Sequence, residues 1–537
     1  MKRYILTAIF ASILAVSCSA EKNNSTVSKA DEPFFQMRGI VLCWDDVIHP
    51  EVIDWIEIMH RNGINTISLC GHDYKSPEYL EMRQKFIDEG FDFEYEEHAM
   101  SYLVPREMIN VHPEYFRMDK DGKRVADGNG CPSSEEGLAY MMSNVAEFAR
   151  IHKPSNHKYY FWLYDGGDVC HCEKCEGHHY TPSDQALIFE NHIIKALREV
   201  DPEAKLAHLA YHTTTPAPTQ IKPEEGIFLE FAPFYRRWDK PLSDRKAIRD
   251  GQEWSHGEQL RMLEDNLRVF GAKDAQVLEY WLDVSMDSNW QKPHQKLRHY
   301  NKEAYLDDLK TYASYGIKNI TTYGIYIDDY YVENFKDISF IDEYGQGLLN
   351  YRDDVFTIGR GKQTLSGFHA PWDGLDDDTE FKCNADGKWF NFQFKVNDAT
   401  ITLNEVKCED DINPEDRIEI FFSPDKAMNR YYCAEVDAAG RIMDYAASFP
   451  AQLDFSWNFE TLETSGKLTK TGYVIKGKVA LEELRSLGVD IDGGFYLGVF
   501  RDDFRKDGSV NWYSYIPTDD ETPNFHKPDV LFKAVVK

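Results

Sequence analysis

The sequence is poor in basic residues, and it lacks both a glycine-rich phosphate loop and a dinucleotide-binding fingerprint. Of its 537 residues, 60 are basic and 91 are acidic, which gives a formal net charge of −31. A chain this acidic is a poor partner for nucleic acid and for anionic membrane surfaces. The same charge disfavours a highly sulfated substrate, unless the binding site is locally basic.

Internal repeats and low-complexity segments are also missing, and no apolar run is long enough to cross a membrane. The run Tyr4–Val16 follows Lys2 and Arg3 and is too short to span a membrane. Residues 1–18 are therefore predicted to be a signal peptide, and the polar residues 19–32 a tether.

The end of the apolar run, Leu14–Cys18, resembles a bacterial lipobox, in which the cysteine is lipidated and becomes the mature N-terminus. The alternative is an ordinary secretory signal cleaved near Ala20. We expect an exported protein that is lipid-anchored to the outer membrane, on its cell-surface or periplasmic face.

The spacing of the ten cysteines is not that of a dense disulfide framework, and Cys43 and Cys70 lie inside apolar, strand-like runs. The exception is a cluster that includes three cysteines at close spacing and a histidine: Cys170, Cys172, Cys175 and His178. This cluster predicts a structural zinc site, a disulfide (Cys170–Cys175, or one with Cys131) or free thiols. No cofactor is expected for catalysis.

Eight strand-like segments alternate with helical patterns over the first 350 residues. They are Met37–Trp44, Ile64–Cys70, Phe91–Glu97, Tyr159–Tyr164, Lys205–Ala210, Ile227–Phe231, Gln276–Tyr280 and Asn319–Tyr323. The count predicts a (β/α)8 barrel over residues 33–352, with a doubly wound sheet as the alternative. Residues 353–537 carry short, often alternating strands, Ala399–Leu403 among them, and predict a β-sandwich.

The segment Tyr159–Val200 is the most informative part of the predicted barrel. A buried aromatic strand is followed by Asp165-Gly-Gly-Asp168, then by the cysteine cluster, then by an amphipathic helix. Polar side chains follow the other predicted strands in the same way: Asp45, His72, His98, Tyr211, His212, Glu279 and Asp328 lie at or just beyond strand ends, and Glu230 lies near one. Such clustering is typical of the catalytic face of a barrel.

Carboxylates at strand ends suggest glycoside hydrolysis, which uses two carboxyl groups about 5–5.5 Å or 6.5–9.5 Å apart. Asp165 is the predicted general acid, Glu279 the nucleophile or base, and Glu230 its alternative. A glutamate in a buried strand is costly unless it is paired. The predicted sugar-binding residues of the barrel are Trp44, His72, His98, Asp168, Tyr211, His212, Trp281 and Tyr323.

The run Asp165-Gly-Gly-Asp-Val-Cys-His-Cys-Glu-Lys-Cys175, with His112-Pro-Glu-Tyr-Phe116 upstream, resembles the barrel family called domain of unknown function 4838. The resemblance covers roughly residues 35–350. It implies a barrel similar to glycoside hydrolases, in exported lipoproteins of polysaccharide degradation. The chain also resembles the hexosaminidase barrels more distantly. It lacks the Asp-Glu pair that follows the fourth strand in those barrels.

The C-terminal region resembles carbohydrate-binding module family 9. The matching pieces are Asp416–Phe422, Gly472–Ile475, Trp512 and Pro523–Pro528. That family clamps sugars between tryptophans, so the resemblance implies that Trp457 and Trp512 bind glycan, the alternative being core packing.

These patterns lead to three hypotheses. The first is an exported glycoside hydrolase that acts on a poly- or oligosaccharide. The second is a glycan-binding lipoprotein without turnover. The third is a metal-dependent carbohydrate deacetylase that uses His72, His98 and nearby carboxylates. The expected partners are a carbohydrate and, through the lipid, a membrane, with no nucleic acid; oligomeric state is not predicted.

Overall fold

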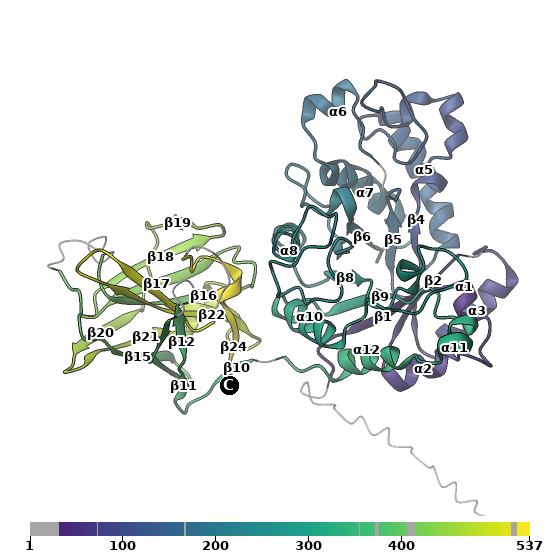
Figure 1. The fold of residues 1–537 in the computed structure, drawn as a ribbon. Coiled ribbons are helices and arrows are strands. Elements are labelled where there is room, and N and C mark those ends of the chain that lie inside the picture. The colour runs from purple at the N-terminus through teal and green to yellow at the C-terminus, as the bar shows by residue number, and fades with distance from the viewer. Residues whose placement is uncertain are drawn as a thin grey trace, which may run out of the picture.

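The computed structural model describes residues 32–71, 73–165, 168–353, 355–370, 375–404, 414–516 and 523–537. Cys18 and His72 lie outside the described residues, so export, lipidation and the predicted role of His72 stay predictions. Figure 1 shows a helix-covered barrel and a separate body of β-strands, which follow one another along the chain.

The first body is a barrel of parallel strands. Its strands are β1 (Met37–Cys43), β2 (Thr66–Cys70), β3 (Asp92–Glu94), β4 (Glu96–His98), β5 (Lys158–Trp162), β6 (Lys205–Ala210), β7 (Ile227–Phe231), β8 (Gln276–Glu279) and β9 (Asn319–Tyr323). The sheet order is β3-β2-β1-β9-β8-β7-β6-β5-β4. Only Tyr95 separates β3 from β4, and β3 pairs with β2 while β4 pairs with β5. The two short strands therefore occupy one position, and the nine strands close into the eight-position barrel that the sequence predicts.

Helices follow most of the strands and cover the barrel (Figure 1). The longer ones are α2 (Trp55–Asn62), α3 (Pro77–Asp88), α5 (Glu135–Ile151), α7 (Pro182–Arg198), α8 (His256–Phe270), α10 (Lys302–Ser314) and α12 (Ser339–Asn350). Side chains cap several of them: Ser76, Ser134, Thr181 and Ser255 each accept a backbone N–H from the first turn. Among the described residues, no helix is both long and apolar enough to cross a membrane.

Short helical segments occupy the strand-to-helix connections. They are α1 (Trp44–Val47), α4 (Met100–Leu103), η1 (Arg106–Asn110), η2 (Pro113–Tyr115), α6 (Glu173–His178), η3 (His212–Thr214), α9 (Val284–Asp287) and α11 (Asp329–Phe335). The connection from β6 to β7, whose residues 211–226 are all described, holds only η3.

Side chains alternate in direction along each barrel strand, so the strands contribute to two buried environments. In β8, Leu278 belongs to the cluster inside the barrel, whereas Val277 belongs to the cluster between strands and helices. Successive side chains point to opposite faces of a strand, so Glu279 points away from the interior. That orientation decides what Glu279 can do.

The second body consists of two sheets. The larger has the strand order β13-β12-β23-β22-β16-β17-β18-β19 with β10 and β24 attached, and the smaller has the order β11-β14-β15-β21-β20. Its strands are β10 (Phe356–Ile358), β11 (Gln363–Leu365), β12 (Phe368–Ala370), β13 (Leu375–Asp377), β14 (Glu380–Ala385), β15 (Trp389–Asn397), β16 (Arg417–Ser423), β17 (Tyr431–Asp437), β18 (Ile442–Ser448), β19 (Gln452–Asp454), β20 (Glu463–Leu468), β21 (Gly472–Ala480), β22 (Phe495–Phe504), β23 (Val510–Ser514) and β24 (Phe532–Val536). The predicted barrel followed by a β-sandwich is confirmed.

Two details of the sandwich prediction change. The predicted strand Ala399–Leu403 is irregular, although its Ile401 and Leu403 still pack on the core. β18, which the sequence analysis missed, pairs with β17. The helix α13 (Leu481–Ser486) follows β21, and the short η5 (Pro528–Val530) precedes β24.

Polar contacts join the two bodies. Arg245 of the barrel pairs with Asp529 of the sandwich at 2.6 Å, and the Tyr496 hydroxyl donates a hydrogen bond to the Ser314 carbonyl. None of these four residues lines the cavity at the carboxyl ends of the barrel strands.

Candidate active site

A cavity of about 210 Å³ opens at the carboxyl ends of the barrel strands. Its lining comes from β4 to β9 and the connections that follow these strands. The lining residues are His98, Trp162, Asp165, Leu209, Tyr211, Phe234, Leu278, Tyr280, Asp283, Ser285, Met286, Trp290, Tyr323 and Ile325. The position is the one where barrel enzymes place their active sites.

Asp165 is the carboxylate that the sequence analysis placed at this site. It follows β5, is exposed and lines the cavity. The hydroxyl of Tyr211 hydrogen-bonds to it, and burial together with this carboxylate raises the pKa of Tyr211. Tyr211 therefore keeps its proton near neutral pH and can donate it to the Asp165 carboxylate.

Asp283, three residues beyond the predicted strand Gln276–Tyr280, is the second carboxylate of the cavity. Its side chain is nearly fully buried, and Oδ1 accepts hydrogen bonds from the Ser285 backbone (3.0 Å) and hydroxyl (2.5 Å). Burial raises the pKa of Asp283 to about 6, against the opposing effect of these hydrogen bonds and of His299. A carboxyl group with this pKa is partly protonated near neutral pH.

Aromatic rings form much of the cavity wall. Tyr280 lies 5.2 Å from Tyr323 and 5.2 Å from Phe234, measured between ring centroids. Trp290 is 58% exposed at the cavity, so a large apolar face is available to a ligand. Mainly apolar walls with a few placed polar groups are typical of small-molecule sites.

His98 adds a polar group to the same cavity. Its Nδ1 lies 2.5 Å from the carbonyl oxygen of Leu163, so this nitrogen donates and carries the proton of the neutral ring. Nε2 is then the free acceptor. His98 therefore stays a predicted ligand-binding residue, now with a defined tautomer.

Glu230 lies inside the barrel and does not line the cavity. Its Oε2 accepts a hydrogen bond from the indole of Trp162, a wall residue, at 2.7 Å. Burial raises the pKa of Glu230 to about 8 and that of Glu94 to about 7. It also raises the pKa of Glu96 well above its ordinary value. The raised pKa values favour the uncharged forms of these carboxyl groups. Glu230 supports Trp162 from behind rather than facing a ligand.

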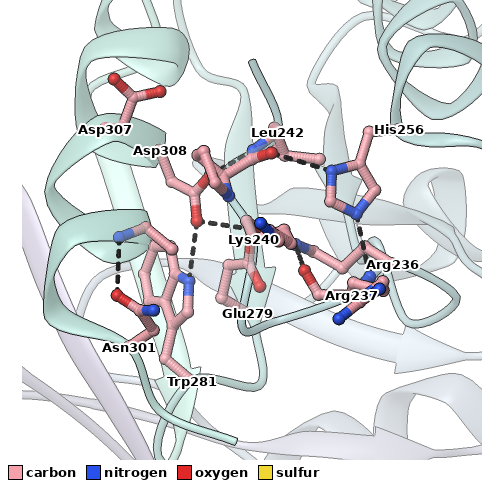
Figure 2. Close-up of polar contacts among 12 residues, drawn as sticks. Arg236, Arg237, Lys240, Leu242, His256, Glu279, Trp281, Asn301, Asp307 and Asp308 are labelled. Atoms are coloured by element: carbon pink, nitrogen blue, oxygen red, sulfur yellow. Dashed lines mark hydrogen bonds and ion pairs between the residues drawn. The ribbon is translucent and has the colours of Figure 1, made fainter. Parts of the chain in front are cut away.

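Glu279 also lies outside the cavity. Its side chain is fully buried behind β8, and its Oε1 pairs with Nη1 of Arg236 at 2.7 Å and accepts the Tyr312 hydroxyl at 2.5 Å. Arg236 also pairs with Asp308 of α10 at 2.7 Å, as Figure 2 shows. The expected role of Glu279 as nucleophile or base does not fit this position, because an ion pair occupies its carboxylate on the far side of the strand.

Four other predicted barrel residues lie away from the cavity lining. Trp281 is fully buried and donates to Asp308 at 3.1 Å, and Trp44 stacks on Tyr79 at 5.9 Å. Asp168 is exposed and lies 3.7 Å from Arg117. His212 lines a much smaller neighbouring cavity, which shares His98 and Tyr211 with the main one.

The two sandwich tryptophans differ. Trp512 lines a cavity of about 240 Å³ together with Phe455, Tyr445 and Arg417. Trp457 packs at 4.8 Å on Tyr432 at the edge of the sandwich core. Trp512 can therefore contact a ligand in that cavity, whereas Trp457 does not line it.

Asp283 is the cavity carboxylate that the sequence analysis did not assign. Its signal is its position a few residues after a buried strand, in the pattern Asp283-Val-Ser285 that caps the short helix α9. Helix capping and site chemistry use the same residue type, and only the cavity distinguishes them.

The barrel segment matches a family model. Residues 19–267 match "Domain of unknown function (DUF4838)", and residues 362–532 match "Carbohydrate family 9 binding domain-like". Both resemblances seen in the sequence are thereby confirmed. No curated protein matches the chain.

Several solved structures are similar in outline. A carbohydrate binding module family 9 from Caldicellulosiruptor kristjanssonii in complex with glucose has 13% identity and a TM-score of 0.25, covering 34% of this chain and 96% of its own. A GH30 endoxylanase from Clostridium papyrosolvens C71 has 9% identity and a TM-score of 0.32, covering 83% and 96%. A β-galactosidase from Halorubrum lacusprofundi has 11% identity and a TM-score of 0.35, covering 60% of each chain.

Proposed function

We propose that this chain is a glycoside hydrolase that acts on a poly- or oligosaccharide at the barrel cavity. The observation that carries the proposal is the pair Asp165 and Asp283, two carboxyl groups that line one aromatic-walled cavity at the carboxyl ends of the strands. Burial raises the pKa of the Tyr280 hydroxyl, and Tyr211 and both of these carboxylates add to the effect. Two carboxyl groups in different environments are what glycoside hydrolysis requires.

The roles follow from the two environments. Asp283 is the proposed general acid, because burial raises its pKa to about 6 and a proton donor must be protonated at the working pH. Asp165 is the proposed base or nucleophile, because it is exposed, lines the cavity and lies beside the protonated hydroxyl of Tyr211. This reverses the role that the sequence analysis gave to Asp165.

The sandwich is proposed to bind the same class of glycan. Its family match names carbohydrate binding, and its cavity combines Trp512 and Phe455 with Arg417 and Glu419, an aromatic surface beside charged groups. This second cavity also favours the other candidate function, a glycan-binding protein without turnover.

The metal-dependent deacetylase gains no such support. In the part of the chain that the structure describes, the side-chain groups close enough to share a metal ion do not include His98, and His72 lies outside that part. If the deacetylase hypothesis were right, activity would be lost to a chelator while the glycosidic linkage stayed intact.

A glycan panel tests the proposal. A soluble form that lacks residues 1–32 is incubated with neutral and acidic oligosaccharides, and both binding and the release of new reducing ends are measured. We expect release from at least one glycan. Binding without release across the panel would reject the hydrolase and leave the glycan-binding protein.

We also propose export and attachment to the outer membrane through a lipid on Cys18, from the lipobox-like Leu14–Cys18. The full chain expressed in a bacterium fed a labelled fatty acid should become labelled, and Cys18→Ala should lose the label and leave the membrane fraction. Equal labelling of both forms would exclude Cys18 as the lipidated residue.

A further inference from the structure

Four cysteines from two separate segments meet at one point beyond the barrel. Cys131 precedes α5, whereas Cys170, Cys172 and Cys175 lie after β5 and in α6. All four are buried, and their Sγ atoms lie within 4.8 Å of one another. The predicted fourth ligand, His178, is not in this group and stacks on Tyr180.

The sulfur separations suit a shared metal ion. Sγ of Cys131 lies 3.5 Å from that of Cys170 and 3.7 Å from that of Cys172. Four thiolates arranged as a tetrahedron around zinc at about 2.3 Å lie about 3.8 Å from one another. A disulfide would instead need two sulfurs at about 2.05 Å.

Hydrogen-bond donors surround the sulfurs. The Met118 backbone N–H donates to Sγ of Cys170 at 3.3 Å, and Arg124 donates to the same sulfur at 3.8 Å while it is anchored to the Phe116 carbonyl. The Ser133 hydroxyl lies 3.1 Å from Sγ of Cys175. Such donors orient metal-bound thiolates and reduce their charge.

We propose that Cys131, Cys170, Cys172 and Cys175 bind one structural Zn²⁺ ion. Four protein ligands fill a tetrahedral site and leave no position for water or substrate, so this ion would stabilise structure and would not take part in catalysis. It would tie the segment before α5 to the connection that starts with Asp165, and so help to place that carboxylate. The metal site rests on the geometry of the four cysteines and on the donors around them, and it stands whether or not the proposed reaction is correct.

Metal analysis of the purified full chain tests the site. Mass spectrometry of the elements should find about one zinc per chain, and titration of the folded protein with a mercurial reagent should release that zinc. Replacement of zinc by Co²⁺ should give the absorption of a tetrahedral thiolate site. Cys170→Ser and Cys172→Ser should each lose most of the zinc. Cys383→Ser changes a buried sandwich cysteine outside the cluster and should keep it.

The cobalt spectrum and the zinc release use the unaltered chain, so the test does not depend on folding of the variants. A zinc-free chain in which peptide mapping finds disulfides among the four cysteines would overturn the proposal. Four free thiols that bind no zinc on reconstitution would also overturn the proposal. One equivalent of iron in place of zinc would overturn it as well.

Discussion

Replacing Arg236 with methionine should destabilise the barrel by about 3–5 kcal/mol, because it leaves two buried carboxylates without their cation. Arg236, Glu279 and Asp308 are all fully buried, and the guanidinium pairs with both acids at 2.7 Å. Thermal and urea unfolding, followed by tryptophan fluorescence and calorimetry, measure the loss. A change below 1 kcal/mol would contradict the ion-pair account.

Two matched variants sharpen this test. Arg237→Met removes the neighbouring guanidinium, which pairs with Asp239 in solvent, and should change stability little. Combining Arg236→Met with Glu279→Gln and Asp308→Asn removes the unpaired charges and should recover much of the lost stability. If the triple variant is as unstable as Arg236→Met, the loss comes from packing and not from charge.

The same ion pairs shape the cavity indirectly. Arg236 also donates to the Lys240 carbonyl at 2.7 Å, and His256 links the Arg237 N–H to the Pro241 carbonyl (Figure 2). The connection after β7 is therefore fixed from its buried side. The neighbouring Phe234 forms part of the cavity wall. Glu279 thus serves the site by holding one of its walls and need not touch a ligand.

Much of the barrel could be predicted because each strand is a short buried apolar run. The predicted strands Lys205–Ala210, Ile227–Phe231 and Asn319–Tyr323 have the bounds found in the structure. Binary patterns of this kind depend only on neighbouring residues. They also place Asp165 just beyond a strand, and it lies three residues after β5, in the cavity lining.

The face of the strand on which a given side chain lies could not be predicted in the same way. Glu279 looks like a catalytic carboxylate because it interrupts a buried strand, yet its partner Arg236 lies 43 residues earlier in the chain. Which of two successive residues faces inward depends on the tilt of the strand in the closed barrel. The fourth cysteine was equally hard to assign: Cys131 lies 39 residues before Cys170, and only the fold brings the two together.

The largest effect on activity is expected from the two cavity carboxylates. Asp283→Asn and Asp165→Asn should each lower kcat for glycan release by about 10²–10⁴-fold, the usual contribution of a general acid or base. Asparagine also caps helices, so Asp283→Asn should fold, and glycan binding should persist in both variants. Asp45→Asn alters an exposed carboxylate at the end of β1, paired with Lys292 and outside the cavity lining, and should keep full activity.

The pH dependence separates the two roles. A general acid acts in its protonated form, so release by the unaltered chain should fall as the pH rises through about 6, the pKa to which burial raises Asp283. Ser285→Ala removes a hydroxyl that donates to Asp283 and favours the ionised form, so it should raise that pKa and shift the fall to higher pH. In Asp283→Asn the residual rate should no longer fall there. If the fall persists in Asp283→Asn, another group supplies the proton, and Asp283 is only the cap of α9.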